Sequence, residues 1–237
     1  MSTRQGHYFS TSTETPSLVH CELCPHHCAL KPGKFGLCKV RQGAEGGISL
    51  PFFGSISSIS IDPIEKKPLY HFRPGSSIFS VGFLGCNLHC PFCQNWEISQ
   101  ETDIQFRRLE PAELVQLAVH SGTGAIAYTY SEPLVHIEYL LEAMQEARKQ
   151  GLANVLVSNG CIVEQPARDV LALTDAANID LKSFKAETYQ HRLGGDLPRV
   201  CRFLELAFEM GVHLEVTTLI VTGMNDAPAE AEGIIEF

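Results

Sequence analysis

The stretch IFSVGFLGCNLHCPFCQNW, residues 78–96, joins a short apolar run to three closely spaced cysteines. The run over residues 78–84 is typical of a buried strand, and Cys86, Cys90 and Cys93 follow it directly. Three thiolates can bind three irons of a [4Fe-4S] cube, whereas electron-carrier clusters use four cysteines. The spacing therefore predicts a cluster with one iron left open for another ligand.

Two other interpretations of this triplet stay open. Cys90 and Cys93, with Pro91 and Phe92 between them, resemble the dithiol of a glutaredoxin-type protein. That interpretation leaves Cys86 without a role and favours a much shorter domain. A structural zinc site is the second alternative, and it needs a fourth ligand such as His89.

A second cysteine group lies near the amino terminus, at Cys21, Cys24, Cys28 and Cys38. Four thiols this close in sequence predict a metal site, and zinc is favoured because such sites close small loop-rich segments that have no core. An auxiliary iron-sulfur cluster and the absence of a metal are the alternatives. Cys161 and Cys201 are interpreted as buried small side chains.

Composition limits the class of protein. The 237 residues are 44% hydrophobic and 19% charged, which suits one main globular domain with a small appendage. The net charge of −9 disfavours nonspecific binding to nucleic acid. No run approaches the ~20 apolar residues of a membrane span. Nine cysteines grouped like metal ligands indicate a reducing compartment, so we expect a cytoplasmic protein.

Strand and helix patterns alternate from residue 78 onward, which predicts a parallel sheet with crossover helices. Strands are expected over 78–84, 125–130, 154–157, 177–181 and 213–221, and helices over 111–120, 134–150, 165–173 and 198–210. The fold class is therefore α/β, a partial (β/α) barrel that resembles a truncated six-unit barrel. We expect residues 1–17 to be disordered, residues 18–72 to form a cysteine-rich metal-binding segment and hairpin, and residues 73–237 to form the core.

Polar residues follow each expected strand, where the loops of a parallel barrel converge on one site. These residues are the cysteine triplet, Tyr130 to Glu132, Ser158 to Gly160, Asp180 with Lys182, and Thr222 to Asp226. Asp180 and Lys182 are two apart on a strand, so their side chains face the same way. A structural ion pair is the alternative to a role at the site.

The triplet with an aromatic residue before its last cysteine resembles the radical S-adenosylmethionine (SAM) superfamily. Nearly the whole chain from Cys21 onward is similar to pyruvate formate-lyase activating enzymes and, more narrowly, to the radical enzyme of the AmmeMemoRadiSam system. The matching runs include residues 36–41, 62–69, 85–100 and 180–182. This resemblance implies a [4Fe-4S] cluster on Cys86, Cys90 and Cys93, with SAM as cosubstrate.

The resemblance also implies cofactor-binding roles for five residues: Phe92, Glu132, Asn159, Asp180 and Lys182. Glu132 matches the acid of a Gly-Gly-Glu-Pro turn that holds the methionine amino group. This chain departs from that turn, because Tyr130 and Ser131 replace the glycines.

The predicted function is an oxidoreductase that cleaves SAM reductively to a 5'-deoxyadenosyl radical, which abstracts hydrogen from a substrate. The resemblance implies an external one-electron reductant of flavodoxin or ferredoxin type, and AmmeMemoRadiSam partner proteins are candidates. The competing classes are a zinc-binding assembly module and a dithiol oxidoreductase. The chain ends at Phe237 within the helix expected after the fifth strand, so the core is expected to be truncated. No residue pattern selects a substrate.

Overall fold

A six-stranded sheet forms the centre of the protein. The computed structural model describes residues 4–11, 17–101 and 103–237. The strand order is β14-β13-β12-β11-β9-β8, with β8 (Ser58–Pro63) as an antiparallel edge strand. The parallel members are β9 (Ser77–Gly82), β11 (Ala125–Thr129), β12 (Ala153–Ser158), β13 (Ala176–Asp180) and β14 (His213–Thr217). The predicted α/β class with parallel strands is confirmed, and the sheet is open, as in a partial barrel.

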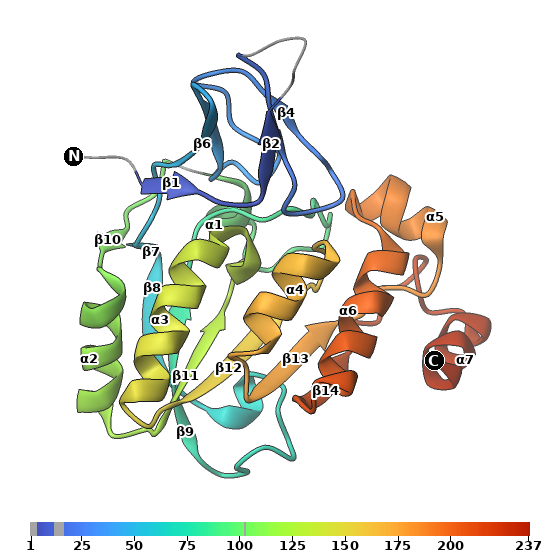
Figure 1. Ribbon diagram of the computed structural model, residues 1–237. Coiled ribbons are helices and arrows are strands. Elements are labelled where there is room, and N and C mark those ends of the chain that lie inside the picture. Colours follow the sequence, from blue (N-terminus) through green and yellow to red (C-terminus); the bar gives the residue numbers. More distant parts are fainter. Residues whose placement is uncertain (1–3, 12–16, 102) are drawn as a thin grey trace.

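Four helices lie over one face of this sheet (Figure 1). They are α2 (Pro111–Ser121), α3 (Ile137–Lys149), α4 (Glu164–Leu171) and α6 (Leu197–Glu209). Helix α2 illustrates how the sequence sets where a helix begins and ends. Its first residue is Pro111, the side chains and backbones of Glu110 and Glu113 form a capping box, and Gly122 ends the helix in the left-handed conformation.

The opposite face of the sheet lines the interior of the partial barrel. Alternate strand residues point to it, and at the amino ends of the strands these are small apolar side chains packed against the segment after β8. Ile64 and Leu69 of that segment are fully buried there. Asn178 on β13 donates to the carbonyl of Pro68 (3.0 Å). Glu215 on β14 accepts from two backbone N–H groups of the same segment. The amino end of the interior is therefore closed, and its carboxyl end stays open.

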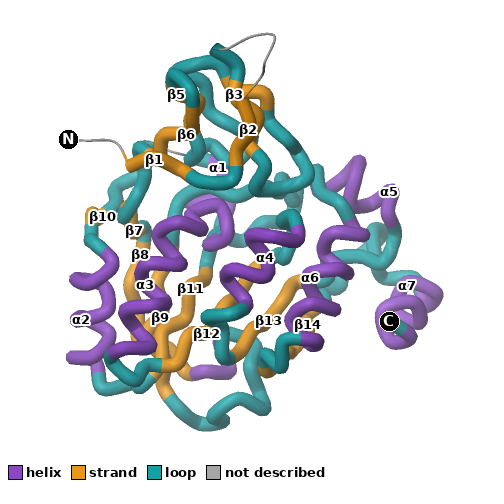
Figure 2. The backbone as a smooth tube through the Cα atoms, viewed as in Figure 1, coloured by secondary structure: helices purple, strands orange, loops and turns teal. Residues whose placement is uncertain are grey.

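The residues before the main sheet form a small unit at the carboxyl ends of the strands (Figure 2). Its strands are β1 (Arg4–Gly6), β2 (Phe9–Thr11), β3 (Val19–Cys21), β4 (Ala29–Leu30), β5 (Gln42–Ala44) and β6 (Gly47–Leu50). They make two antiparallel three-stranded sheets, β1-β6-β5 and β2-β3-β4. The prediction of disorder over residues 1–17 is wrong for residues 4–11, because β1 pairs with β6 and β2 with β3. Residues 1–3 and 12–16 lie outside the described residues.

Two other boundaries differ from the prediction. Strand β8 (Ser58–Pro63) lies in the expected hairpin segment 18–72 but pairs antiparallel with β9, so it belongs to the main sheet. Strand β7 (Ser55–Ile56) precedes it and pairs with β10 (Arg107–Arg108). The last strand ends at Thr217 rather than at residue 221, because the Asn225 side chain holds residues 219 and 221 in a turn.

The remaining short elements connect these layers. They are η1 (Ile64–Lys66), α1 (Trp96–Gln100), η2 (Pro133–His136), α5 (Ala186–Thr188), η3 (Tyr189–Leu193) and α7 (Pro228–Glu236). Within the described part of the chain, no helix has the length and apolar character that crossing a membrane requires.

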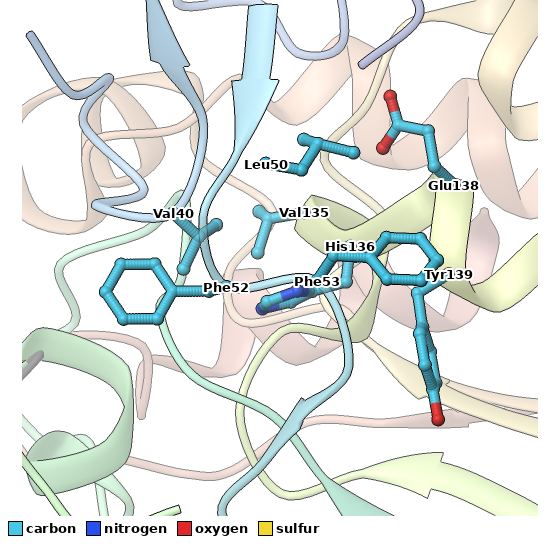
Figure 3. Close-up of a pocket in the computed structure, with 8 residues that line it drawn as sticks. All are labelled: Val40, Leu50, Phe52, Phe53, Val135, His136, Glu138 and Tyr139. Carbon is cyan, nitrogen blue, oxygen red and sulfur yellow. The ribbon is translucent and has the colours of Figure 1, made fainter. Parts of the chain in front are cut away.

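A buried ion pair joins the amino-terminal unit to α3. Arg41 donates to both carboxylate oxygens of Glu138 (2.9 and 2.7 Å), and the two residues are only 1% and 5% exposed. The backbone of His7 donates to Glu138 and accepts from Arg41. Beside this pair lies a small cavity lined by residues of both parts (Figure 3). Its volume is about 10 Å³, about the size of one water molecule, so it cannot take a ligand.

We predict that Glu138→Gln lowers the free energy of unfolding by about 3–5 kcal/mol, because it leaves the Arg41 charge buried without its partner. Urea unfolding followed by circular dichroism measures this change. Glu142→Gln is the matched control on the same helix. Glu142 pairs with Arg4 at 3.4 Å and both side chains are about half exposed, so its loss is expected to cost only about 0–1 kcal/mol. Equal effects of the two substitutions would contradict the prediction.

A second prediction concerns His136, which is 6% exposed and hydrogen-bonds through Nε2 to the carbonyl of Leu84 (2.7 Å). Burial lowers its pKa from 6.5 to about 4. The unfolded chain therefore binds a proton that the folded chain does not, and stability falls as pH decreases from about 6.5 towards 4. His136→Gln removes this contribution, so the stability difference between wild type and variant should shrink with decreasing pH in urea titrations. A difference that stays constant with pH would count against this assignment.

Candidate functional site

The open end of the barrel interior is a pocket of about 590 Å³. A volume of this size suits a ligand of several hundred daltons. The pocket contains every core residue for which a site role is predicted: Cys86, Cys90, Phe92, Cys93, Glu132, Asn159, Asp180 and Lys182. These residues come from the loops after β9, β11 and β12, from the end of β13 and from the segment just after it. The expected convergence is therefore observed for the groups after the first four strands. The fifth group, residues 222–226, does not line the pocket; because the last strand ends at Thr217, Thr217 and Leu219 lie there instead.

The loop that carries the three cysteines is held by its backbone on several sides. Gly85 has a φ of +78°, donates to the carbonyl of Ile98 (2.8 Å) and accepts from the N–H of Glu132 (3.3 Å). The Asn87 side chain donates to the carbonyl of Cys161 (2.7 Å), and His26 hydrogen-bonds to the Asn87 carbonyl (2.7 Å). Several of these bonds come from the amino-terminal unit and from the loops after β11 and β12. The backbone conformation of the cysteine loop therefore depends on contacts with these other parts of the protein.

Glu132 is the most strongly engaged carboxylate of the pocket. It accepts hydrogen bonds from Leu134 N (3.0 Å), Ser158 Oγ (2.7 Å) and Asn159 N (2.9 Å), and it is 2% exposed. Burial raises its pKa to about 7 although the three donors act in the opposite direction. Each carboxylate oxygen accepts two hydrogen bonds at most, so Oε2, with one donor, has capacity left for a cation in the pocket.

Asp180 and Lys182 form an ion pair in the pocket, with 2.9 Å between Oδ2 and Nζ. The predicted common direction of their side chains is therefore confirmed. The backbone N–H of Lys182 donates to the Tyr189 hydroxyl (3.0 Å). Burial has the largest single effect and lowers the Lys182 pKa, but the charge and hydrogen bond of Asp180, together with the nearby thiols of Cys90 and Cys86, raise it overall. The lysine consequently stays charged and can meet an anionic group of a ligand.

A second charged network borders the pocket and was missed at the sequence level. The buried Asp62 carboxylate binds Lys67 Nζ (2.7 Å), Lys66 Nζ (2.9 Å) and the Tyr130 hydroxyl (2.5 Å). Lys67 also lies over the Tyr130 ring, 4.2 Å from its centroid, and Tyr130 has a φ of +69°. The local pattern points the other way: on β8, Ile59 and Ile61 alternate with Ser60 and Asp62, which predicts buried isoleucines, yet both isoleucines are exposed and Asp62 is buried.

The dithiol interpretation receives no support from the thiol chemistry of the pocket. A reactive dithiol needs a lowered pKa on its attacking cysteine. Burial raises the pKa of Cys90 to about 11, although Lys182 acts against it. His89, the candidate fourth zinc ligand, is not among the residues that line the pocket.

The four amino-terminal cysteines lie near one another: the backbone N–H of Cys21 donates to the carbonyl of Cys28 (3.0 Å). Burial raises the Cys24 pKa, and Cys21, Cys38 and Cys28 each add a smaller effect in the same direction. Among the described residues, however, no group of three or more His, Cys, Asp or Glu side chains is arranged to hold a metal ion. A single zinc ion needs all its ligands about 2.0–2.3 Å from one point. The metal at this group therefore stays a prediction.

That requirement does not apply to the triplet in the pocket. In a [4Fe-4S] cube each cysteine binds a different iron, so three sulfurs around one cube lie farther apart than ligands of one ion. The donor set of three cysteines, with a pocket of about 590 Å³ in front of them, fits such a cluster.

Comparison with known proteins identifies relatives. The family model described as the Radical SAM superfamily matches residues 81–237, more than half of the chain. An uncharacterized protein of Methanocaldococcus jannaschii is 38% identical over 221 residues, which are 92% of this chain and 66% of that protein. The 7-carboxy-7-deazaguanine synthase of Thermococcus kodakarensis is 31% identical over 45% of this chain and 49% of its own length. The chain thus spans less than two thirds of these two relatives.

A more distant relative is pyruvate formate-lyase 1-activating enzyme of Escherichia coli K12, which is 21% identical over 67% of each chain. Among solved structures, SuiB of Streptococcus suis, crystallised with S-adenosylmethionine, aligns with a TM-score of 0.54. That alignment covers 65% of this chain and 36% of SuiB at 11% identity, so it shows a shared fold and nothing more.

Proposed function

Because the chain belongs to the radical SAM superfamily, whose members use a [4Fe-4S] cluster and S-adenosylmethionine, we propose that its pocket binds both cofactors and cleaves SAM reductively. The observation that carries this proposal is the gathering of Cys86, Cys90 and Cys93 with two carboxylates and a lysine in one pocket. Three cysteines bind three irons, and the fourth iron is then free to bind the cosubstrate.

The residues around the triplet have the charges that a methionine group needs. Glu132 offers a carboxylate oxygen to the ammonium group, and the bond also offsets the cost of a buried negative charge. Lys182 supplies a positive charge for the carboxylate, while Asp180 holds the lysine in position. Phe92, which lies between Cys90 and Cys93 in the sequence, lines the same pocket and would contact the bound cofactors.

A [4Fe-4S] cluster held by Cys86, Cys90 and Cys93 would, when bound and reduced, supply the electron that cleaves the bond between the SAM sulfonium and the ribose 5' carbon, giving methionine and a 5'-deoxyadenosyl radical. The electron comes from an external one-electron reductant of flavodoxin or ferredoxin type. Abstraction of one hydrogen atom from a substrate would then give 5'-deoxyadenosine. Because one relative activates a protein, pyruvate formate-lyase 1, a protein is one candidate substrate, through a backbone glycine or a side chain, and a small molecule is the other.

The decisive experiment uses protein reconstituted anaerobically with iron and sulfide, then given dithionite and SAM. We expect about four irons and four sulfides for the triplet, as in a [4Fe-4S] cube, and formation of 5'-deoxyadenosine. Cys86→Ser, Cys90→Ser and Cys93→Ser should each abolish the product, which is measured by chromatography. If the protein were instead a dithiol oxidoreductase that uses Cys90 and Cys93, Cys86→Ser would leave its thiol–disulfide exchange activity intact.

The matched control is Cys201→Ser, a cysteine on α6 that does not line the pocket. It should keep its iron content and its product yield. A quadruple variant of Cys21, Cys24, Cys28 and Cys38 separates iron at the triplet from metal at the amino-terminal group. A well-folded wild type that binds only zinc would refute the enzymatic proposal.

A further prediction concerns Glu132→Gln. A hydrogen bond between charged groups contributes about 1.5–3 kcal/mol, so losing the carboxylate should weaken SAM binding about 10- to 100-fold. The Glu132 pKa of about 7 adds a pH dependence. Only the ionised carboxylate accepts from the ammonium, so wild-type affinity should rise as pH increases through 7. Equilibrium dialysis with labelled SAM measures both effects.

Glu138→Gln is the control for this experiment, because Glu138 is an equally buried carboxylate that does not line the pocket. It is expected to lower stability and to leave SAM affinity and its pH profile unchanged. If both variants bind SAM equally well, Glu132 does not hold the ammonium group.

A further inference from the structure

The sulfur of Cys86 lies in an unusual environment for one member of the triplet. The backbone N–H of Leu88 donates to it at 3.3 Å, and the side-chain amide of Asn159 donates to it at 3.7 Å, within the longer range of hydrogen bonds to sulfur. Cys93 has a different contact, with the Ser99 hydroxyl at 3.9 Å. The cluster ligands are therefore not equivalent in their hydrogen bonds.

The polar atoms of the Asn159 side chain are all engaged within the protein. Oδ1 accepts from the N–H of Cys161 (2.8 Å), and Nδ2 donates to Asn87 Oδ1 (2.9 Å) as well as to Cys86. Asn159 is only 4% exposed. Because both contacts of Nδ2 are made within the protein, the amide has no free donor for the ribose or carboxylate of a cosubstrate.

Asn87 fixes the orientation of the Asn159 amide. Its Nδ2 donates to the carbonyl of Cys161, which leaves its Oδ1 as an acceptor facing Asn159. The N–H of Cys161 in turn requires an acceptor, so the Asn159 oxygen faces Cys161 and its nitrogen faces the sulfur. Because a reversed amide would lose both contacts, the donor is directed at Cys86 by the network itself.

We propose that Asn159 is a positioning residue that sets the reduction potential of the cluster, through its hydrogen bond to the Cys86 sulfur. The proposal rests on the cluster assignment above. Reduction adds negative charge to the cluster and its sulfurs, and an N–H donor stabilises that charge. Asn159 thereby raises the potential and makes the cluster easier to reduce by an external donor.

The test is a redox titration of reconstituted Asn159→Leu holoprotein, followed by absorbance and electron paramagnetic resonance. Leucine has a similar shape and no hydrogen to donate. We expect the ratio of reduced to oxidised cluster at a fixed potential to fall about tenfold, which is a midpoint shift of about 59 mV to more negative values for one electron. An unchanged midpoint with the same iron content overturns the proposal.

Asn154→Leu is the matched control. Asn154 is also fully buried, and its amide donates to the carbonyls of Met144 and Leu173, away from the pocket. It should lower stability and leave the midpoint unchanged. A shift equal to that of Asn159→Leu would show that general destabilisation is the cause, and would overturn the proposal.

Asn159→Leu could also fail to retain the cluster, and wild-type holoprotein with ¹⁵N-labelled asparagine side chains then decides. Pulsed electron paramagnetic resonance of the reduced wild-type cluster should show a coupling to ¹⁵N. This coupling should disappear in Asn159→Ala; if that variant also loses iron, the wild-type spectrum alone decides. Absence of the coupling in the wild type overturns the proposal. If the wild type binds no iron-sulfur cluster, the proposed function itself fails, and this outcome is distinct from a cluster whose potential ignores Asn159.

Discussion

The buried carboxylate of Glu132 connects the loops after three neighbouring strands. Its backbone N–H binds the carbonyl of Gly85 at the start of the cysteine loop, and its side chain accepts from Ser158 and Asn159 after β12. A carboxylate away from water is costly without compensation. The three hydrogen-bond donors offset part of the cost of burying this charge. The Glu132 pKa of about 7, above the usual value for a glutamate, shows that they do not offset all of it. The pocket is thus built around a charge that a cationic ligand would stabilise.

The rest of the fold keeps this pocket open in one direction. The segment after β8 closes the amino end of the interior with Ile64 and Leu69, while four helices cover the outer face of the sheet. At the opposite end the amino-terminal unit is held by the buried pair of Arg41 and Glu138. The interior can therefore accept a ligand only at the carboxyl ends of the strands, where the polar side chains are.

Local pattern was sufficient to predict much of this arrangement. The apolar runs located the five parallel strands to within a few residues, and the period of two correctly paired Asp180 with Lys182. The convergence of the residues after the first four strands followed from strand direction alone, whereas residues 222–226 after the fifth strand lie outside the pocket. These features depend on residues close in sequence or on a general property of parallel sheets.

What the sequence did not reveal depends on distant partners. Strands β1 and β2 are short and polar, and they are ordered only by pairing with β6 and β3. The contact between Tyr130 and Asp62 joins residues 68 positions apart. The Asn159 amide likewise needs Asn87 and Cys161 to direct it, so no local pattern could distinguish a ligand-binding asparagine from one that serves a cysteine.

Gly85 has a consequence for how the protein is made. A Cβ atom at this position would lie 2.3 Å from the carbonyl oxygen of Cys38, so the two backbones are in direct contact and neither can shift alone. The amino-terminal unit leaves the ribosome before the loop against which it rests. The amino-terminal unit cannot reach its final position until the cysteine loop has been synthesised. The conformation of the cysteine loop in turn depends on contact with the amino-terminal unit. We therefore expect the amino-terminal unit and the cysteine loop to reach their final arrangement together, once the loop has been synthesised.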